Sequence, residues 1–296
     1  MSQSQIDQLF STIKHFKITI PIPEIAYIQI NRPKKRNCFT SQTWKEYQFI
    51  IEKLSTLKLA HDDGDTSNVD VIKVIILSGE GSHFCSGIDI SELSQFASVS
   101  PKSNNNDHQM SDLKKLKDLE SFQNCISTPL RIDIPIIAIT HGITYGLALD
   151  IIAACQIRLT TKDTQFAIKE IDLGIIADIG SLQRLPGLVN NISVLNELAY
   201  TGRGFNGDEA LSLGLVSSVF DSKEQAFQYA LELAKNMKQK YGPALKGTKK
   251  CLDSMTNDTV EVNQGLKQVA LDNSQLMSDP NYLKFISKRF KGLVKL

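Results

Sequence analysis

The sequence lacks any surplus of charge of one sign. Its 33 Lys and Arg residues are balanced by 32 Asp and Glu residues, which leaves a formal net charge of +1. Because proteins bind nucleic acid or an anionic membrane surface through an excess of basic residues, this balance argues against both partners. An anionic ligand would therefore have to be held by a local group of residues.

Cysteine is scarce and irregularly placed. The chain contains five cysteines, an odd number, and no CxxC pair. Disulfide frameworks and zinc sites need paired or closely spaced cysteines, so we predict free thiols in a reducing compartment and no metal. The sequence also contains no Walker loop and no Rossmann fingerprint, which argues against the common nucleotide cofactors.

Long apolar runs and a targeting leader are also missing. We predict no membrane span, because no window is long and apolar enough, and no secretory signal or mitochondrial presequence at the amino end. The sequence ends on Val294, Lys295 and Leu296, which keep two residues of the Ser-Lys-Leu peroxisomal address. We expect a peroxisomal protein that an import receptor recognises through this tail. A basic helix end without a signal, in a cytoplasmic protein, is the alternative.

What is present is the composition of a folded α/β protein. The 296 residues are 42% hydrophobic and 22% charged, enough to bury a sizeable core. Residues 16–33 read as a hairpin, 41–57 as an amphipathic helix, and 71–77 and 134–139 as buried strands. A helix at about 146–154 and short strands at 157–160 and 165–168 follow. Strands that alternate with helices at this spacing predict an α/β fold.

The composition becomes helical after residue 202. Amphipathic patterns at 207–213, 222–237, 243–255 and 260–274 predict four further helices. We therefore divide the chain into a core at residues 1–200 and a C-terminal helical region at residues 201–296.

Three stretches carry candidate chemistry. The first, residues 84–90 (FCSGIDI), follows the first buried strand, where a Ser-Gly pair usually marks only a turn. The second, residues 141–150 (HGITYGLALD), turns a buried strand into a helix. Backbone N–H groups at a helix start are free to stabilise a developing negative charge, as on the carbonyl oxygen when carbon beside a thioester loses a proton.

The third stretch, residues 166–186 (FAIKEIDLGIIADIGSLQRLP), places Glu170 and Asp178 among aliphatic residues. Burial there would raise their pKa values toward neutrality, the range useful to a general acid or base. For any single loop acid, a solvated or salt-bridged side chain is the commoner explanation.

Together, the three motifs in this order resemble the crotonase, or enoyl-CoA hydratase/isomerase, superfamily. The resemblance runs from Ile18 to Phe220 and includes NRPKKRN at residues 31–37. The strings SGID at 86–89, KEID at 169–172 and ADIGSLQRLP at 177–186 are most similar to the Δ3,5-Δ2,4-dienoyl-CoA isomerases. The resemblance implies a crotonase spiral of ββα turns, a C-terminal helical trimerisation region, and homotrimers or homohexamers.

The resemblance also implies roles for residues of this chain. The amides of Ser86 and Leu147 would form an oxyanion hole, and Asp150, Glu170 and Asp178 would be the catalytic acids. Asp150 would support the site, while the other two move protons at opposite ends of the diene. The substrate thioester and pantetheine would lie along Ser86, Gly87, Ile88, Asp89, Ile90 and Leu147. Lys34, Lys35 and Arg36 could hold CoA phosphates, or form a plain solvated basic loop.

The expected reaction is conversion of 3,5-dienoyl-CoA to 2,4-dienoyl-CoA in the oxidation of unsaturated fatty acids, with no cofactor beyond the CoA of the fatty acyl-CoA substrate. It moves a proton to a carbon four bonds away, which is too far for one carboxylate. The first alternative is a Δ3-Δ2-enoyl-CoA isomerase or enoyl-CoA hydratase that depends mainly on Glu170. The second is a crotonase-fold binding or assembly subunit without catalysis, since Gly146, Leu147 and Ala148 stand where many relatives have three glycines.

Overall fold

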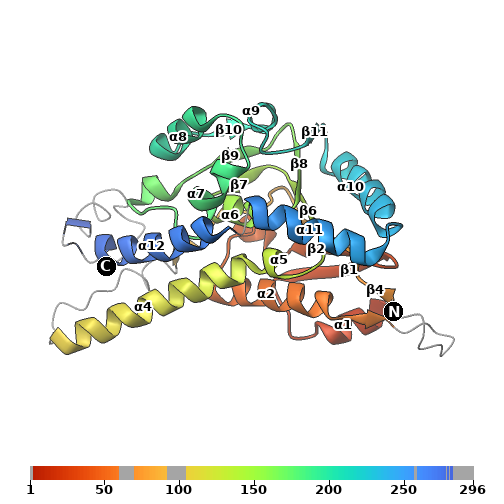
Figure 1. The fold of residues 1–296 in the computed structure, drawn as a ribbon, viewed down its shortest axis with the longest axis horizontal. Coiled ribbons are helices and arrows are strands. Elements are labelled where there is room, and N and C mark those ends of the chain that lie inside the picture. Colours follow the sequence, from red (N-terminus) through yellow and green to blue (C-terminus); the bar gives the residue numbers. More distant parts are fainter. Residues whose placement is uncertain are drawn as a thin grey trace.

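The computed structural model describes residues 3–59, 70–91, 105–256, 259–277, 279 and 281–282 (Figure 1). Its main sheet has the strand order β1-β2-β5-β6-β8-β11. The predicted hairpin is confirmed, because β1 (Phe16–Ile22) pairs antiparallel with β2 (Ile25–Ile30). The strands β5 (Val74–Gly79), β6 (Ile136–Thr140), β8 (Ile157–Thr161) and β11 (Ser218–Phe220) continue the sheet in parallel.

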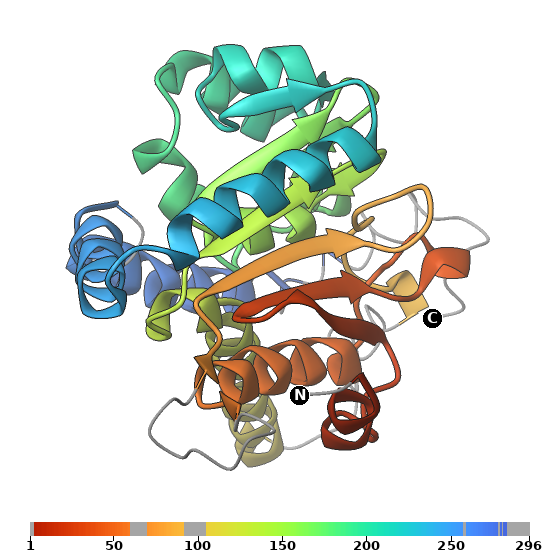
Figure 2. The same cartoon turned by 90° about the vertical axis from the view of Figure 1, so that its right-hand side faces the viewer.

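Both faces of this sheet are covered. Every residue of β5 and β6 is buried, as expected for parallel strands between two helical layers. On one face lies α10 (Lys223–Lys238), which is seen in front of the strands in Figure 2. Its Ala226, Ala230 and Ala234 recur every fourth residue and pack against the sheet, so the small side chains let the helix approach closely.

The other face holds the larger core. The predicted helix at 41–57 is α2 (Ser41–Ser55), which begins at a Thr40 cap and buries Trp44, Tyr47 and Ile50. Around it lie α1 (Gln3–Leu9), α4 (Asn105–Ile126), α5 (Thr128–Arg131) and α6 (Leu147–Ala153). A small hairpin, β3 (Lys58–Leu59) and β4 (Asp70–Val71), follows α2.

A second sheet, β10-β9-β7, stands beside the first. It is built from β7 (Ile143–Tyr145), β9 (Gln165–Ala167) and β10 (Phe205–Asn206). The chain also forms four short helical turns: η1 (Pro33–Lys35), η2 (Glu170–Leu173), α7 (Ser181–Arg184) and η3 (Leu185–Gly187). Because β7 leads directly into α6, this sheet fixes where that helix begins.

The four helices predicted after residue 202 are confirmed as α9 (Gly207–Ser212), α10, α11 (Gly242–Thr256) and α12 (Val260–Met277). An additional helix, α8 (Ile192–Thr201), precedes them. The strands β10 and β11 also come from this part of the chain: β10 pairs with β9 in the second sheet, and β11 pairs with β8 in the main sheet. The division at residue 200 stays a prediction. None of the helices in the described ranges is long and apolar enough to cross a membrane.

Candidate active site

The segment that carries Ser86 and Gly87 is held between two other parts of the chain. The Phe39 N–H donates to the Gly87 carbonyl (2.9 Å), and the Asp89 N–H donates to the Phe39 carbonyl (2.7 Å). Gly87 has a φ of +99°, and a Cβ there would lie 3.2 Å from the Tyr145 carbonyl oxygen. Glycine is therefore required where this segment passes the end of β7.

The Asp89 side chain is engaged within the protein. It forms an ion pair with Arg32 (3.2 Å) and accepts from the Ser91 hydroxyl (2.7 Å). Burial acts to raise the pKa of Asp89, but the hydrogen bonds from Ser91, Cys38 and Arg32 outweigh it and lower the pKa to about 2. Asp89 is thus an ionised anchor of the loop, while Ile90 beside it is 48% exposed.

The two predicted oxyanion amides differ in what they already bind. The Ser86 N–H donates to the Arg36 carbonyl (3.0 Å), so it can reach a thioester oxygen only by sharing or exchanging this hydrogen bond. The Leu147 N–H is the first amide of α6 and has no intrahelical acceptor. The Leu147 amide is therefore the better candidate for stabilising negative charge.

Leu147 and Ala148, which follow Gly146, fit this helix start without backbone strain. Both side chains are buried in the main core, and neither residue is among those with positive φ. Gly146 remains a glycine, with a φ of +56°, and a Cβ there would lie 2.7 Å from Glu170 Oε1. The one position that needs glycine has kept it, and the Glu170 carboxyl lies against it.

Asp150 comes from the first turn of α6 and is 1% exposed. Its Oδ1 accepts the Ser181 N–H (2.5 Å). Burial raises the pKa of Asp150, while the Ser181 hydrogen bonds and the positive charge of Arg184 oppose the rise. Arg184 is itself fully buried and donates to the Ser127 hydroxyl (2.8 Å). The carboxyl therefore belongs to a buried group of charges.

Glu170 lies at the start of η2. Burial raises its pKa, and the neighbouring charges of Asp150 and Asp178 raise it further. Its Oε2 is buried and has no hydrogen-bond partner among the described residues. A partly buried carboxyl with a raised pKa and an unused oxygen is suited to take or give a proton.

Asp178 lies just before α7 and is held from both sides. Its Oδ2 accepts from Asn273 of α12 (2.6 Å), and its carbonyl accepts from Gln123 of α4 (2.6 Å). Burial raises the pKa of Asp178 to about 7, against the lowering effect of the Asn273 hydrogen bond; the charge of Asp150 adds to the rise. Asp150, Glu170 and Asp178, here called the acid cluster, thus influence one another electrostatically although 28 positions of sequence separate the first from the last.

The predicted phosphate contacts, and a histidine at the start of the second stretch, lie outside the acid cluster. Lys34, Lys35 and Arg36 are exposed on and after η1, and the Arg36 carbonyl connects this loop to Ser86. The His141 ring faces the Gly81 carbonyl (3.1 Å). Burial, together with the charge of Lys223, lowers the pKa of His141 to about 4. Within the described ranges, no group of three or more His, Cys, Asp or Glu residues could hold a metal ion.

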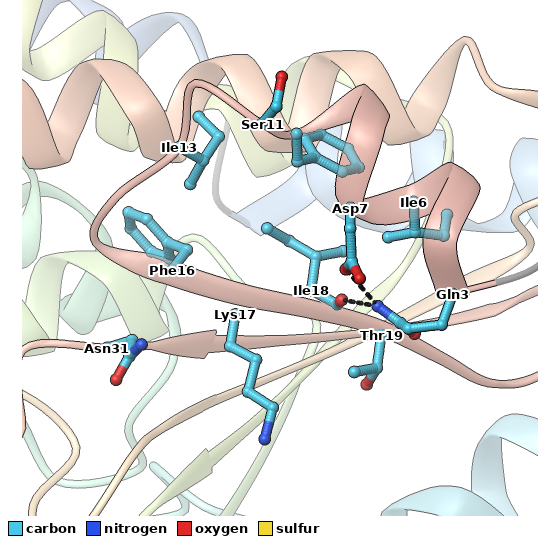
Figure 3. A pocket seen from close by; sticks show the side chains of 11 residues that line it. Gln3, Ile6, Asp7, Ser11, Ile13, Phe16, Lys17, Ile18, Thr19 and Asn31 are labelled. Atoms are coloured by element: carbon cyan, nitrogen blue, oxygen red, sulfur yellow. Dashed lines mark hydrogen bonds between the residues drawn. The ribbon is translucent and has the colours of Figure 1, made fainter.

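A separate cavity of about 510 Å³ lies between α1 and the edge strand β1 (Figure 3). Gln3 spans it, donating to Asp7 (2.8 Å) and to the Ile18 carbonyl (3.0 Å). The second of these bonds attaches α1 to β1, the edge strand of the main sheet. None of the acid cluster lines this cavity.

Sequence reasoning did not identify Arg184, Gln123 or Asn273 as site residues. Arg184 stands in the SLQRLP string, so a charged residue in an otherwise apolar stretch was a usable signal. Gln123 and Asn273 lie in long helices without any motif, and only the packing of α4 and α12 brings them to Asp178.

Comparison with known proteins identifies the class. The enoyl-CoA hydratase/isomerase family model matches residues 23–282, so the chain belongs to this family, the crotonases, whose α/β fold it adopts. The chain is 39% identical over 253 residues to an Arabidopsis thaliana peroxisomal Delta(3,5)-Delta(2,4)-dienoyl-CoA isomerase, covering 86% of this chain and 85% of that one. A human mitochondrial Delta(3,5)-Delta(2,4)-dienoyl-CoA isomerase is 32% identical over 270 residues, covering 91% and 77%.

Solved structures agree on the fold. An enoyl-CoA hydratase from Bacillus halodurans superposes with a TM-score of 0.73 at 23% identity, over 95% of this chain and all of that one (100%). The predicted α/β crotonase fold is therefore confirmed, and the chain is a crotonase-family acyl-CoA enzyme.

Proposed function

We propose that this enzyme converts 3,5-dienoyl-CoA to 2,4-dienoyl-CoA. The observation that carries the proposal is the third acid of the acid cluster, Asp178, whose pKa of about 7 lets it hold or release a proton near neutral pH. The two dienoyl-CoA isomerases described above support the same reaction. A double-bond shift through one pair of carbons would not need this third acid.

In the proposed mechanism, one carboxylate removes a proton from C2, beside the thioester. The electron pair forms C2=C3, the C3=C4 pair moves to C4=C5, and the C5=C6 pair takes a proton at C6 from a second carboxyl. We assign C2 to Glu170, because its carboxyl lies against Gly146, next to the Leu147 amide that would stabilise the thioester oxygen. Asp178 then serves C6. Each turnover leaves the two carboxyls with exchanged protonation states, and a further proton transfer resets them.

For substrate binding we propose that the thioester and pantetheine lie along Ser86, Gly87, Ile88 and Ile90, with Asp89 fixing the loop from behind. Lys34, Lys35 and Arg36 would meet the CoA phosphates outside the buried site, since all three are exposed while the loop carbonyl of Arg36 bonds to Ser86. We propose that the reaction uses no cofactor beyond the CoA of the substrate, because the thioester itself makes the C2 proton acidic.

The direct test is an assay of the purified protein with 3,5-dienoyl-CoA, 3-enoyl-CoA and 2-enoyl-CoA side by side. We expect the highest kcat/KM with the first. Preference for 3-enoyl-CoA or 2-enoyl-CoA would instead indicate a Δ3-Δ2-enoyl-CoA isomerase or a hydratase. The hydratase alternative is supported by the 28% identity of the chain to a Short-chain-enoyl-CoA hydratase from Clostridium acetobutylicum. Inactivity with all three would favour the binding or assembly subunit.

We also propose self-association through the junction of α11 and α12. Three apolar side chains are exposed there, Leu252 (61%), Met255 (78%) and Val260 (67%), which is unusual on a free surface. Homotrimers or homohexamers would cover them. Light scattering should show such an oligomer, and Met255→Glu should shift it toward the monomer; an unchanged monomer in both proteins would contradict the proposal.

The peroxisomal location stays a prediction. The names of the two isomerases place one in peroxisomes and the other in mitochondria. Val294, Lys295 and Leu296, through which an import receptor would act, lie outside the described residues.

A further inference from the structure

Asn273 of α12 contacts the acid cluster from a part of the chain that carries no catalytic motif. Figure 1 shows α12 running beside α4, and the Asn273 side chain is 1% exposed. Its Oδ1 accepts the Ile176 N–H (3.0 Å), and its Nδ2 donates to the Ile176 carbonyl (2.8 Å). This two-point pairing with one backbone residue fixes which end of the carboxamide faces Asp178.

The remaining hydrogen of that nitrogen determines how Asp178 is used. Nδ2 donates to Asp178 Oδ2 (2.6 Å), and an amide nitrogen can only donate. Oδ2 must therefore be an acceptor, so when the carboxyl is protonated its hydrogen sits on Oδ1. Gln123, in contrast, donates to the backbone carbonyls of Asp178 and Leu266. It therefore links the backbone at Asp178 to α12 and forms no hydrogen bond with the Asp178 carboxylate.

We propose that Asn273 is a positioning residue for the isomerisation: it occupies Asp178 Oδ2 and so leaves the proton for C6 on Oδ1. This inference rests on the proposed function. It assigns to α12 a part of the reaction beyond the packing of a C-terminal helix.

The charges around Asp178 make this hydrogen bond consequential. The charge of Asp150 on α6 raises the pKa of Asp178, and Asp150 and Asp178 together raise the pKa of Glu170 on η2. The positive charge of Arg184 on α7 acts on Asp150 in the opposite direction. The Asn273 donor opposes these acids, because its hydrogen bond is stronger to the ionised carboxylate than to the neutral acid. Its removal should raise the pKa of Asp178 above about 7.

The test compares Asn273→Leu, which keeps the approximate volume, with Gln268→Leu, a control on the exposed face of the same helix. With 3,5-dienoyl-CoA we expect Asn273→Leu to lower kcat by about 10-fold to 100-fold, as for the loss of a hydrogen bond to a charged group. KM should change little. The limb of the pH–kcat profile due to Asp178 should move to higher pH, whereas Gln268→Leu should match the unmodified enzyme.

A merely structural role is excluded by a double-variant cycle. If Asn273 acts through Asp178, then Asn273→Leu should have little further effect on kcat in an Asp178→Asn background. The same fold-loss in both backgrounds, with an unmoved pH limb, would overturn the proposal. Should Asn273→Leu not fold, Asn273→Ser, whose hydroxyl is too short to reach Asp178, takes its place in the cycle.

Failure of the proposed function would remain distinguishable. An unmodified enzyme that does not convert 3,5-dienoyl-CoA refutes the reaction, but the ionisation of Asp178 can still be followed by infrared titration of protein labelled at the aspartate carboxyl carbon, with Asp178→Asn identifying the band. A higher titration midpoint in Asn273→Leu supports the positioning role, and an identical midpoint overturns it.

Discussion

Two groups of charged residues inside this protein, each buried or partly buried, differ in whether the negative charges have positive partners. In the first, Lys249 of α11 donates to Asp253 (2.6 Å) and to the Pro129 carbonyl (2.9 Å), and Gln156 donates to Asp253 (3.1 Å). Every charge there has an opposite charge or a hydrogen bond. The second is the acid cluster, in which the positive charge of Arg184 acts on Asp150 while the carboxyls raise one another's pKa values.

The difference separates a structural site from a candidate catalytic one. The matched buried pair of Lys249 and Asp253 attaches α11 to the core through its ion pair and the hydrogen bond to Pro129. The acids of the acid cluster have raised pKa values, which costs folding free energy but keeps their protons exchangeable near neutral pH. We therefore expect changes in the first group to act on folding and changes in the second to act on turnover.

The largest expected effect is on turnover. Glu170→Gln removes the base at C2 and should abolish conversion of both 3,5-dienoyl-CoA and 3-enoyl-CoA. Asp178→Asn removes only the C6 group, so 3,5-dienoyl-CoA turnover should slow by about 100-fold to 10,000-fold while 3-enoyl-CoA turnover is comparatively spared. Steady-state kcat for both substrates measures this. Equal, small effects of Asp178→Asn on the two substrates would make the aspartate a bystander.

Substitutions in the pair of Lys249 and Asp253 should lower the free energy of unfolding and leave turnover unchanged. Lys249→Met leaves Asp253 buried without its positive partner, so unfolding should become easier by about 3–5 kcal/mol. The double variant Lys249→Met/Asp253→Leu, which removes both charges, should recover much of that loss. Urea denaturation of the three proteins measures these differences, and kcat per folded enzyme should stay unchanged. A single variant as stable as the unmodified protein would show that the pair contributes nothing.

Much of the fold could be predicted from local patterns. The hairpin, α2, the buried strands and the helices after residue 202 each have a periodicity that survives in the structure. The strand predicted at 71–77 was displaced: Val71 belongs to β4, and β5 begins at Val74, where it pairs with Ile25 of β2. Where a strand begins and ends depends on its pairing with a neighbouring strand, and a local sequence pattern holds no information about that neighbour.

The candidate site was predictable only in part for a related reason. Asp150, Glu170 and Asp178 stand in recognisable strings, and the fold brings their charges together. The hydrogen bond from Ser86 to the Arg36 carbonyl and the hold of Asn273 on Asp178 depend on how distant segments pack. Asn273 lies 95 positions after Asp178, in a helix whose pattern is that of ordinary packing.

The smallest expected effect is on how stability depends on pH. Burial and the neighbouring acids raise the folded-state pKa of Glu170 above its unfolded value. Between those two pKa values the folded state binds more protons than the unfolded state, so this residue makes the protein less stable as pH rises from about 4 upward. Below about pH 4 the carboxyl is protonated in both states and contributes nothing. Glu170→Gln removes the effect, so its Tm relative to the unmodified protein should be higher at pH 8.5 than at pH 5. The expected gain is on the order of 2 kcal/mol, or about 4–8 °C.

Differential scanning calorimetry between pH 5 and pH 8.5 tests this prediction. The control is Glu232→Gln, at an exposed position, whose Tm difference from the unmodified protein should not change with pH. A difference for Glu170→Gln that is equally flat would show that the Glu170 carboxyl ionises as freely in the folded protein as in the unfolded chain, and that the acid cluster is compensated after all.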